Sequence, residues 1–372
     1  MKCNAATLRR AGDALGFLAG CCLLVFAASR ATGADAPPDP ATATRRGLAL
    51  VTRAGSNWQR NQDCFSCHHQ SLPMLAIVEA EPAGFRPDPE WIRLQADYSH
   101  TYFRKRTTAM LAGDHVPGGA VTVGYGLWAL SLARRRPDDT TAAMVAYLLQ
   151  IQGVVTKKDR DLTRPLGLED GRWLTSCRRP PLTSSPIAAT VLVLRGLEEY
   201  ATAAQRPLVA EARSRAEKWL AQAALREQED RVWRLWGLHY LGGDESAKAG
   251  IRKAILAVQR DDGGWGQTDT LQSDAYSTGT TLFVLCKSGL PVTDPAVVRA
   301  RDYLLRTQHA DGSWLVETRI TRPVQPFFEN GDPHGKHQFL STSATAWATA
   351  ALAQLLPKSA SAAGAGGIPR AD

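Results

Sequence analysis

Cys64 and Cys67 are separated by two residues and followed directly by His68. This Cys-x-x-Cys-His spacing attaches haem c, because each thiol can form a thioether with one vinyl group of the porphyrin. The histidine after the second cysteine lies under the iron as an axial ligand. The motif therefore predicts a covalently bound haem c at Cys64, Cys67 and His68, and a redox role for the protein.

His334 and His337 are the other histidines whose spacing suits a metal. If the two ends of the fold meet, they face the cysteine motif, and either one completes a bis-histidine iron opposite His68. A zinc centre is the alternative, because the two cysteines and the two histidines have the Cys-x2-Cys and His-x2-His spacings of a tetrahedral site. A disulfide or free thiols are the third interpretation of the cysteines.

Further residues near the motif or with similar chemistry are expected to have other roles. His69 is expected to point away from His68, as a partner of a haem propionate or as an exposed side chain. Met74 lies about 9 Å further along a continuous helix, so it is expected in the core and not on the iron. Cys177 is expected to be a free or buried thiol, and Cys286 to pack as a small hydrophobe.

The N-terminus predicts export, which haem attachment requires in bacteria. Basic residues precede an apolar run over 14–28, and small residues continue as far as Ala36. At about 15 residues the run is short for a membrane span. Residues 1–36 are therefore predicted to be a cleaved signal peptide that directs the protein to the periplasm. A lipoprotein modified at Cys21 and an uncleaved N-terminal anchor are the alternatives.

The charge of the chain gives no reason to expect a nucleic acid partner. The formal net charge is +8, and it falls to +6 when residues 1–36, with four basic and two acidic side chains, are removed. Both signs are interspersed along the remaining chain, so no integral membrane domain is expected either. The expected partners are an apolar small molecule or a redox protein.

A repeat is visible in the C-terminal half. The pattern Gln-x3-Gly-x-Trp occurs at Gln259–Trp265 and again 49 residues later at Gln308–Trp314. Each copy ends a charged amphipathic stretch and precedes an apolar one, which is typical of repeat architectures. Followed backwards, the two kinds of stretch predict six pairs of helices. The charged members are expected over 43–58, 90–110, 138–152, 208–224, 246–259 and 294–308, and their apolar partners over 66–80, 122–136, 184–201, 231–242, 274–289 and 341–356.

This division predicts an all-α fold, an α/α toroid in which six buried inner helices are wrapped by six outer helices with a solvent-facing side. The toroid is expected over 43–357, after a linker at 37–42, and a tail rich in Ala, Gly and Ser at 358–372 is expected to be disordered. The long segment between Trp314 and Ser341 is expected to cover the metal site.

The repeats resemble those of the terpene cyclase and protein prenyltransferase family, including squalene-hopene cyclases, whose α/α toroids carry the same motif. The resemblance covers 43–357, is strongest in the last two repeats, and weakens over 208–242. Glu169–Trp173 keeps half of the motif. In that family the Gln and Trp tie an outer helix to the next inner helix, and the central cavity suits isoprenoid ligands.

The catalytic residues of the family are not found in this chain. There is no Asp-x-Asp-Asp acid motif, and Asp261 and Asp262 fall inside a repeat turn. The zinc motif Asp-x-Cys has its nearest equivalent at Asp274–Tyr276, where tyrosine replaces the cysteine. Asp274 is a candidate acid in the cavity or, alternatively, the N-cap of a helix.

The sequence therefore predicts an exported haem c protein with a toroid fold that acts on, or binds, an isoprenoid-like molecule. A cyclase-like or lyase-like enzyme with an unidentified acid is one alternative. A zinc-stabilised scaffold without catalysis is the other.

Overall fold

The computed structural model describes residues 37–153, 171–175, 179–320 and 330–359, which all belong to one compact unit, Pro37–Asp372. The predicted signal peptide, Cys177 and most of the predicted tail lie outside these residues. None of the described helices combines the length and the hydropathy that crossing a bilayer requires.

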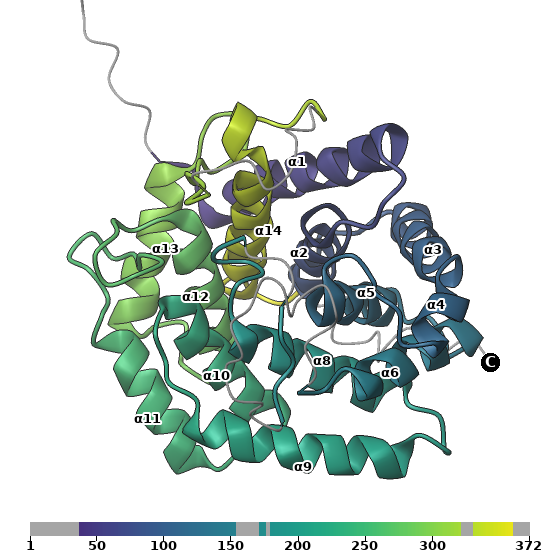
Figure 1. Cartoon of the computed structure of the whole chain (residues 1–372). Coiled ribbons are helices and arrows are strands. Elements are labelled where there is room, and N and C mark those ends of the chain that lie inside the picture. Colours follow the sequence, from purple (N-terminus) through teal and green to yellow (C-terminus); the bar gives the residue numbers. More distant parts are fainter. Residues whose placement is uncertain (1–36, 154–170, 176–178, 321–329, 360–372) are drawn as a thin grey trace, which may run out of the picture. The chain divides into compact units, whose positions relative to one another are not determined.

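The described residues form two concentric sets of helices (Figure 1) and no named strand, which confirms the predicted α/α toroid with six inner and six outer helices. The outer helices are α1 (Pro40–Asn61), α3 (Pro89–Arg104), α6 (Asp139–Gln150), α9 (Arg206–Gln222), α11 (Glu245–Leu256) and α13 (Pro295–Thr307). The inner helices are α2 (Leu72–Ala80), α5 (Gly119–Leu132), α8 (Pro186–Tyr200), α10 (Gln228–Tyr240), α12 (Ala275–Lys287) and α14 (Gln338–Gln354). Shorter elements are η1 (Cys67–Ser71), η2 (Glu81–Ala83), α4 (Thr107–Leu111) and η3 (Gly335–His337).

Three of the outer helices begin in the same way. Asp39, Asp88 and Asp294 are N-caps whose carboxylates accept hydrogen bonds from the first turns of α1, α3 and α13, and a proline follows each of them. An aspartate cap satisfies backbone N–H groups that have no partner inside the helix, and proline at the first position needs no such partner. The local sequence therefore specifies the residue at which each of these three outer helices begins.

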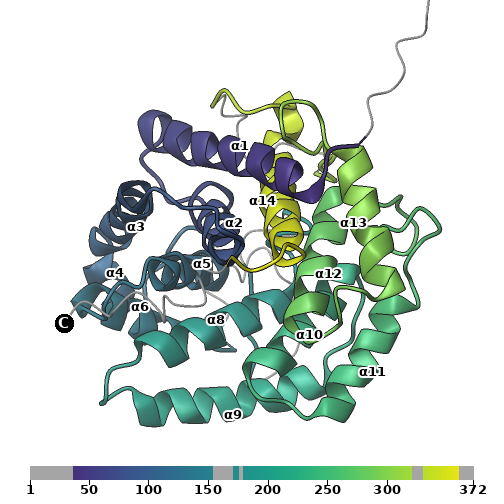
Figure 2. The same ribbon diagram turned by 180° about the vertical axis from the view of Figure 1, so that it is seen from behind.

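The ring closes between the first and the last repeat. Helix α14 packs against α12 on one side and against α1 and α2 on the other. Figure 2 shows α1 running past α14 and α2 at the point of closure. The side chain of Gln308, which follows α13, donates a hydrogen bond of 2.9 Å to the carbonyl of Ala43 in α1. The last outer helix is therefore tied to the first.

The repeat motif joins three helices at once. The Trp265 indole donates to the carbonyl of Ile255 in α11 at 2.9 Å, while its backbone N–H donates to Thr278 in α12. Gln259 reaches the next outer helix, α13, where it donates to the Ala296 carbonyl. Gly263 has a φ of +85°, and a Cβ there would lie 2.5 Å from a carbonyl oxygen of α13. The glycine therefore lets α13 approach the turn closely.

Candidate functional site

The cysteine motif lies at the start of the first inner helix, as the sequence predicts. Cys64 and Cys67 are half-buried cysteines between α1 and α2 that form no disulfide with each other, and η1 begins at Cys67. Phe65 stands six residues after Gln59, the same interval that separates glutamine from tryptophan in the later repeats. The Gln59 side chain donates to the Leu94 carbonyl of α3, as Gln259 does to α13. The motif therefore occupies a repeat turn in which Phe65 takes the place of tryptophan.

The ring of His68 is packed on several sides. It is 6% exposed, and its centroid lies 5.8 Å from that of Trp58, 4.4 Å from that of His69 and 5.4 Å from that of Phe339. Burial lowers the pKa of His68 well below its ordinary value, so the imidazole is neutral. A neutral imidazole is the form that can bind iron through a ring nitrogen. Haem attachment at Cys64, Cys67 and His68 stays a prediction.

The expectation that His69 is an exposed side chain was wrong, and its role as a propionate partner stays a prediction. The side chain is fully buried and stacks on Trp58 with ring centroids 4.4 Å apart. Its Nε2 atom lies 2.7 Å from Oδ2 of Asp332, which is also buried. The position beside His68 is buried because η1 turns His69 toward the residues that precede α14. This pair is a second link between the first and the last repeat.

The structure does not bring His334 and His337 together with the two cysteines. The Nε2 atom of His334 lies 2.7 Å from the Ser313 hydroxyl, and Nδ1 of His337 accepts a hydrogen bond of 3.0 Å from the backbone of Thr318. Within the described part of the chain, no group of three or more His, Cys, Asp or Glu side chains is placed to hold a metal. Both histidines instead form hydrogen bonds with residues of the last repeat. The bis-histidine and zinc centres stay predictions.

Asp274 caps α12. Its carboxylate accepts a hydrogen bond of 2.8 Å from the backbone N–H of Ser277, so the N-cap interpretation is confirmed. Burial raises the pKa of Asp274 to about 6. Its role as an acid in the cavity stays a prediction.

The interior contains an acid that the sequence interpretation missed. Glu229, in the first turn of α10, is 4% exposed. Its Oε1 atom accepts hydrogen bonds from the Trp233 indole at 2.8 Å and from the Tyr276 hydroxyl at 3.1 Å. Burial raises its pKa to about 8, although both hydrogen bonds act in the opposite direction. At neutral pH the carboxyl is therefore mostly protonated.

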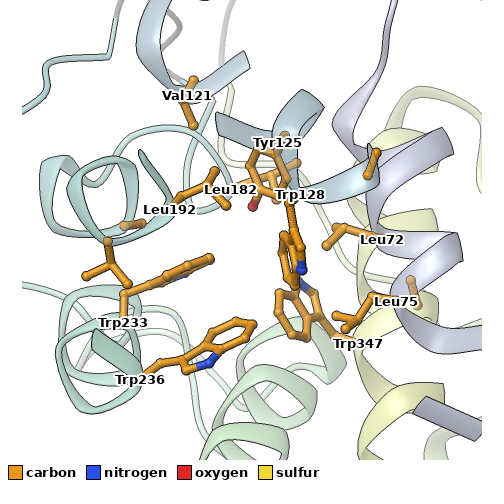
Figure 3. Packing of buried hydrophobic residues seen from close by; sticks show 14 of the residues in the cluster. Leu72, Leu75, Val121, Tyr125, Trp128, Leu182, Leu192, Trp233, Trp236 and Trp347 are labelled. Atoms are coloured by element: carbon orange, nitrogen blue, oxygen red, sulfur yellow. The ribbon is translucent and has the colours of Figure 1, made fainter. Parts of the chain in front are cut away.

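Aromatic side chains from four inner helices form a cluster in the interior (Figure 3), and one of them, Trp233, is the residue whose indole donates to Glu229. The ring centroids of Trp233 and Trp236 in α10 are 4.9 Å apart, and Trp236 lies 5.3 Å from Trp128 in α5 and 5.7 Å from Trp347 in α14. Phe283 in α12 completes the cluster. Faces of aromatic rings attract cations through their quadrupoles. The interior can therefore stabilise positive charge on an apolar ligand.

A pocket opens between α5, α8 and α10. Its cavity volume is about 10 Å³, which is room for about one water molecule. One end holds Arg195, whose guanidinium lies 5.0 Å from the centroid of Trp128 and 5.6 Å from that of Tyr240. The side chains that line it are those of Trp128, Val191, Leu192, Arg195, Trp233, Trp236 and Tyr240. Its wall is therefore apolar apart from one cation.

One sequence signal pointed to this acid. Glu229, Trp233 and Trp236 follow the i, i+4, i+7 spacing of one helix face. They were missed because the acid motif sought was Asp-x-Asp-Asp, and because this repeat lacks the Gly-x-Trp turn.

Comparison with known proteins supports the fold. No family model matches the chain. A squalene–hopene cyclase from Zymomonas mobilis is 29% identical over 90 residues, which cover 19% of this chain and only 14% of the cyclase.

Three solved structures share the architecture. The type II terpene cyclase MstE from Scytonema is 14% identical and matches with a TM-score of 0.51, covering 86% of this chain and 98% of that one. A protein from Actinoplanes is 16% identical with a TM-score of 0.50, covering 85% and 99%. A glycosidase variant is 12% identical with a TM-score of 0.50, covering 84% and 98%. At these identities the likeness shows the fold alone, and the protein has a terpene cyclase-like α/α toroid.

Proposed function

We propose that this protein is a terpene cyclase-like enzyme that starts the cyclisation of an isoprenoid by protonating it, with Glu229 as the acid. The observation that carries the proposal is a buried carboxyl, protonated at neutral pH, at the wall of an aromatic interior. A general acid works best when its pKa lies near the operating pH, because it must hold its proton and also release it.

The hydrogen bonds of Glu229 support different roles for its two carboxyl oxygens. Both hydrogen bonds from the described residues go to Oε1, which leaves Oε2 to carry the proton. Transfer of that proton to an alkene carbon creates a carbocation and leaves a carboxylate. The N–H of Trp233 and the O–H of Tyr276 then stabilise the carboxylate, which makes the proton easier to release.

The aromatic walls support the steps that follow. Attack of a second alkene on the carbocation forms a carbon–carbon bond and moves the positive charge along the ligand. The rings of Trp128, Trp233, Trp236 and Trp347 offer faces to that charge at several places. Loss of a proton from carbon ends the reaction, so the net change is an isomerisation.

A glycosidase function fits less well, although one solved neighbour is a glycosidase. Glycoside hydrolysis generally needs two carboxyl groups that flank the bond to be broken. Beside Glu229, Asp230 accepts hydrogen bonds from the Ser185 hydroxyl and from two backbone N–H groups. Glu227 pairs with Arg319 at 2.7 Å. Both neighbouring carboxylates are thus held in structural contacts.

The test is incubation with farnesol, geranylgeraniol and squalene in D2O, followed by mass spectrometry of the products. Protonation by Glu229, whose proton exchanges with solvent, places one deuterium on carbon in a cyclised product. Glu229→Gln is expected to abolish this product, while the control Glu245→Gln, at an exposed glutamate of α11, leaves it unchanged. A cyclised, deuterated product from Glu229→Gln contradicts the proposal.

A second candidate function is that of a periplasmic haem c protein. It is supported by the spacing of Cys64, Cys67 and His68 and by the position of the two half-buried cysteines at the start of the first inner helix. Its test is expression with haem-maturation factors. A Soret band and a mass increment that survive denaturation, and that Cys67→Ser removes, are expected. Colourless protein with only its polypeptide mass contradicts it.

A further inference from the structure

Three buried hydrogen-bond donors in the interior have no partner among the described residues. They are the hydroxyl of Tyr125 and the indole N–H groups of Trp128 and Trp347, and each residue is 1% exposed. An indole N–H can only donate, and a buried donor without an acceptor costs about 1–3 kcal/mol. Three such donors in one place are a substantial cost.

The three donors belong to one cluster. The ring centroids of Tyr125 and Trp128 are 5.9 Å apart, and those of Trp128 and Trp347 are 6.0 Å apart. In Figure 3 the Tyr125 oxygen points into the interior between α5 and α10, and the nitrogens of Trp128 and Trp347 appear next to each other. The three donors therefore lie within one aromatic cluster, on the inner helices α5 and α14.

Tryptophans elsewhere in the toroid show that a buried indole N–H in this fold can have a hydrogen-bond acceptor. The indoles of Trp173, Trp265 and Trp314 are equally buried, and each donates to a backbone carbonyl at 2.8–2.9 Å. These three hold the scaffold together. Trp128 and Trp347 differ because they face the interior, where no carbonyl of the described helices meets them.

We infer that Tyr125, Trp128 and Trp347 bind an oxygen atom of the substrate, so that the substrate is an oxygenated isoprenoid and not a hydrocarbon. This inference rests on the proposed function. A carbonyl, ether or hydroxyl oxygen has two lone pairs and can accept hydrogen bonds from two of these donors at once, whereas an alkene carbon has no lone pair to accept them.

The protonation state of Tyr125 agrees with this role. Burial raises the pKa of Tyr125 well above its ordinary value, and the nearby Cys67 and Glu229 act in the same direction. The phenol therefore keeps its proton and acts as a donor. The same closeness to Glu229 places the oxygen site beside the proposed acid.

The experiment compares two ligands of the same shape in the Glu229→Gln variant, which cannot turn them over. One is geranylacetone, and the other is the hydrocarbon in which a methylene group replaces the carbonyl oxygen. We expect the ketone to bind about tenfold more tightly, which corresponds to one well-made hydrogen bond. In protein labelled with 15N-tryptophan, the ketone alone should shift the indole N–H signals of Trp128 and Trp347 downfield. The signal of Trp265 is the internal control.

Removal of one donor gives a second readout. Tyr125→Phe deletes only the hydroxyl, so it should reduce the preference for the ketone while leaving the affinity for the hydrocarbon unchanged. Equal affinities of the two ligands, or unmoved indole signals, overturn the inference even if the wild-type enzyme cyclises an isoprenoid. A clear ketone preference in a protein that never incorporates deuterium supports the oxygen site and refutes the proposed acid chemistry instead.

Discussion

Glu229→Gln should make the protein more stable at alkaline pH while it removes the proposed activity. The carboxyl of Glu229 has a pKa of about 8 in the folded protein, against an ordinary value of 4.5. Because the folded-state pKa is raised, the contribution of this group is fully favourable below pH 4.5 and is lost as the pH rises through 8. Glutamine is neutral at every pH and has nearly the same shape.

The size of the effect follows from the two pKa values. Each pKa unit corresponds to about 1.4 kcal/mol, so the raised pKa of Glu229 lowers the free energy of unfolding by roughly 1–2 kcal/mol at pH 5.5 and by roughly 4–5 kcal/mol at pH 9. Wild-type protein should therefore lose about 3 kcal/mol between these two pH values that the Glu229→Gln variant does not lose.

The assay is urea unfolding followed by tryptophan fluorescence at both pH values, with Glu245→Gln as the control. Asp274, whose pKa is about 6, is present in all three proteins, so its contribution cancels in the comparison. The two glutamine variants should differ little at pH 5.5 and by several kcal/mol at pH 9. If the difference between wild type and Glu229→Gln is the same at both pH values, Glu229 is not protonated in the folded protein, and the proposed acid loses its basis.

Three further predictions concern the scaffold, and equilibrium urea unfolding measures all of them. Gly263→Ala should lower the free energy of unfolding by about 2–4 kcal/mol, because φ is +85° and the new Cβ meets the backbone of α13. The matched change Gly250→Ala lies in a helix with open space around it, so it should raise the free energy of unfolding by up to about 1 kcal/mol. Asp332→Ala should cost about 2 kcal/mol, because it leaves the buried His69 without its partner; an unchanged stability would show that the pair does not hold the ring closed. Gln308→Ala removes two hydrogen bonds at the closure of the ring and should cost about 1–2 kcal/mol, and it should also speed proteolysis of α1.

The sequence predicted all twelve main helices because each of them has a strong local signal. The outer helices alternate charged and apolar residues, and the inner ones are apolar or small on all sides. The closure of the ring was also predictable, since repeats of this kind need neighbours on both sides. The individual side-chain contacts at the closure were not predictable from the sequence. They are made by His69 and Asp332, which are far apart in the sequence and fit no metal-binding spacing.

The repeat turn from Gln59 to Phe65 and the acid were missed for different physical reasons. Phe65 fills the position of a repeat tryptophan without an indole N–H, and Asp63 replaces the glycine, so no Gly-x-Trp pattern marks the turn. Glu229 reads as an ordinary charged residue in the first turn of a helix, where carboxylates are common. Only the packing of α10 and α12 shows that it is buried and bonded to Tyr276.

The interior contains buried polar groups that lower the stability of the fold and that a purely structural core does not need. At pH 7 the buried carboxyl of Glu229 costs about 3 kcal/mol relative to a neutral residue, and the unpartnered donors of Tyr125, Trp128 and Trp347 add to that cost. Replacement by leucine or phenylalanine would remove both costs without disturbing the ring. The repeat turns show the opposite pattern, since every buried indole there is satisfied. A buried carboxyl and three unpartnered donors in one aromatic cluster mark the interior as the place where a ligand contributes the missing interactions.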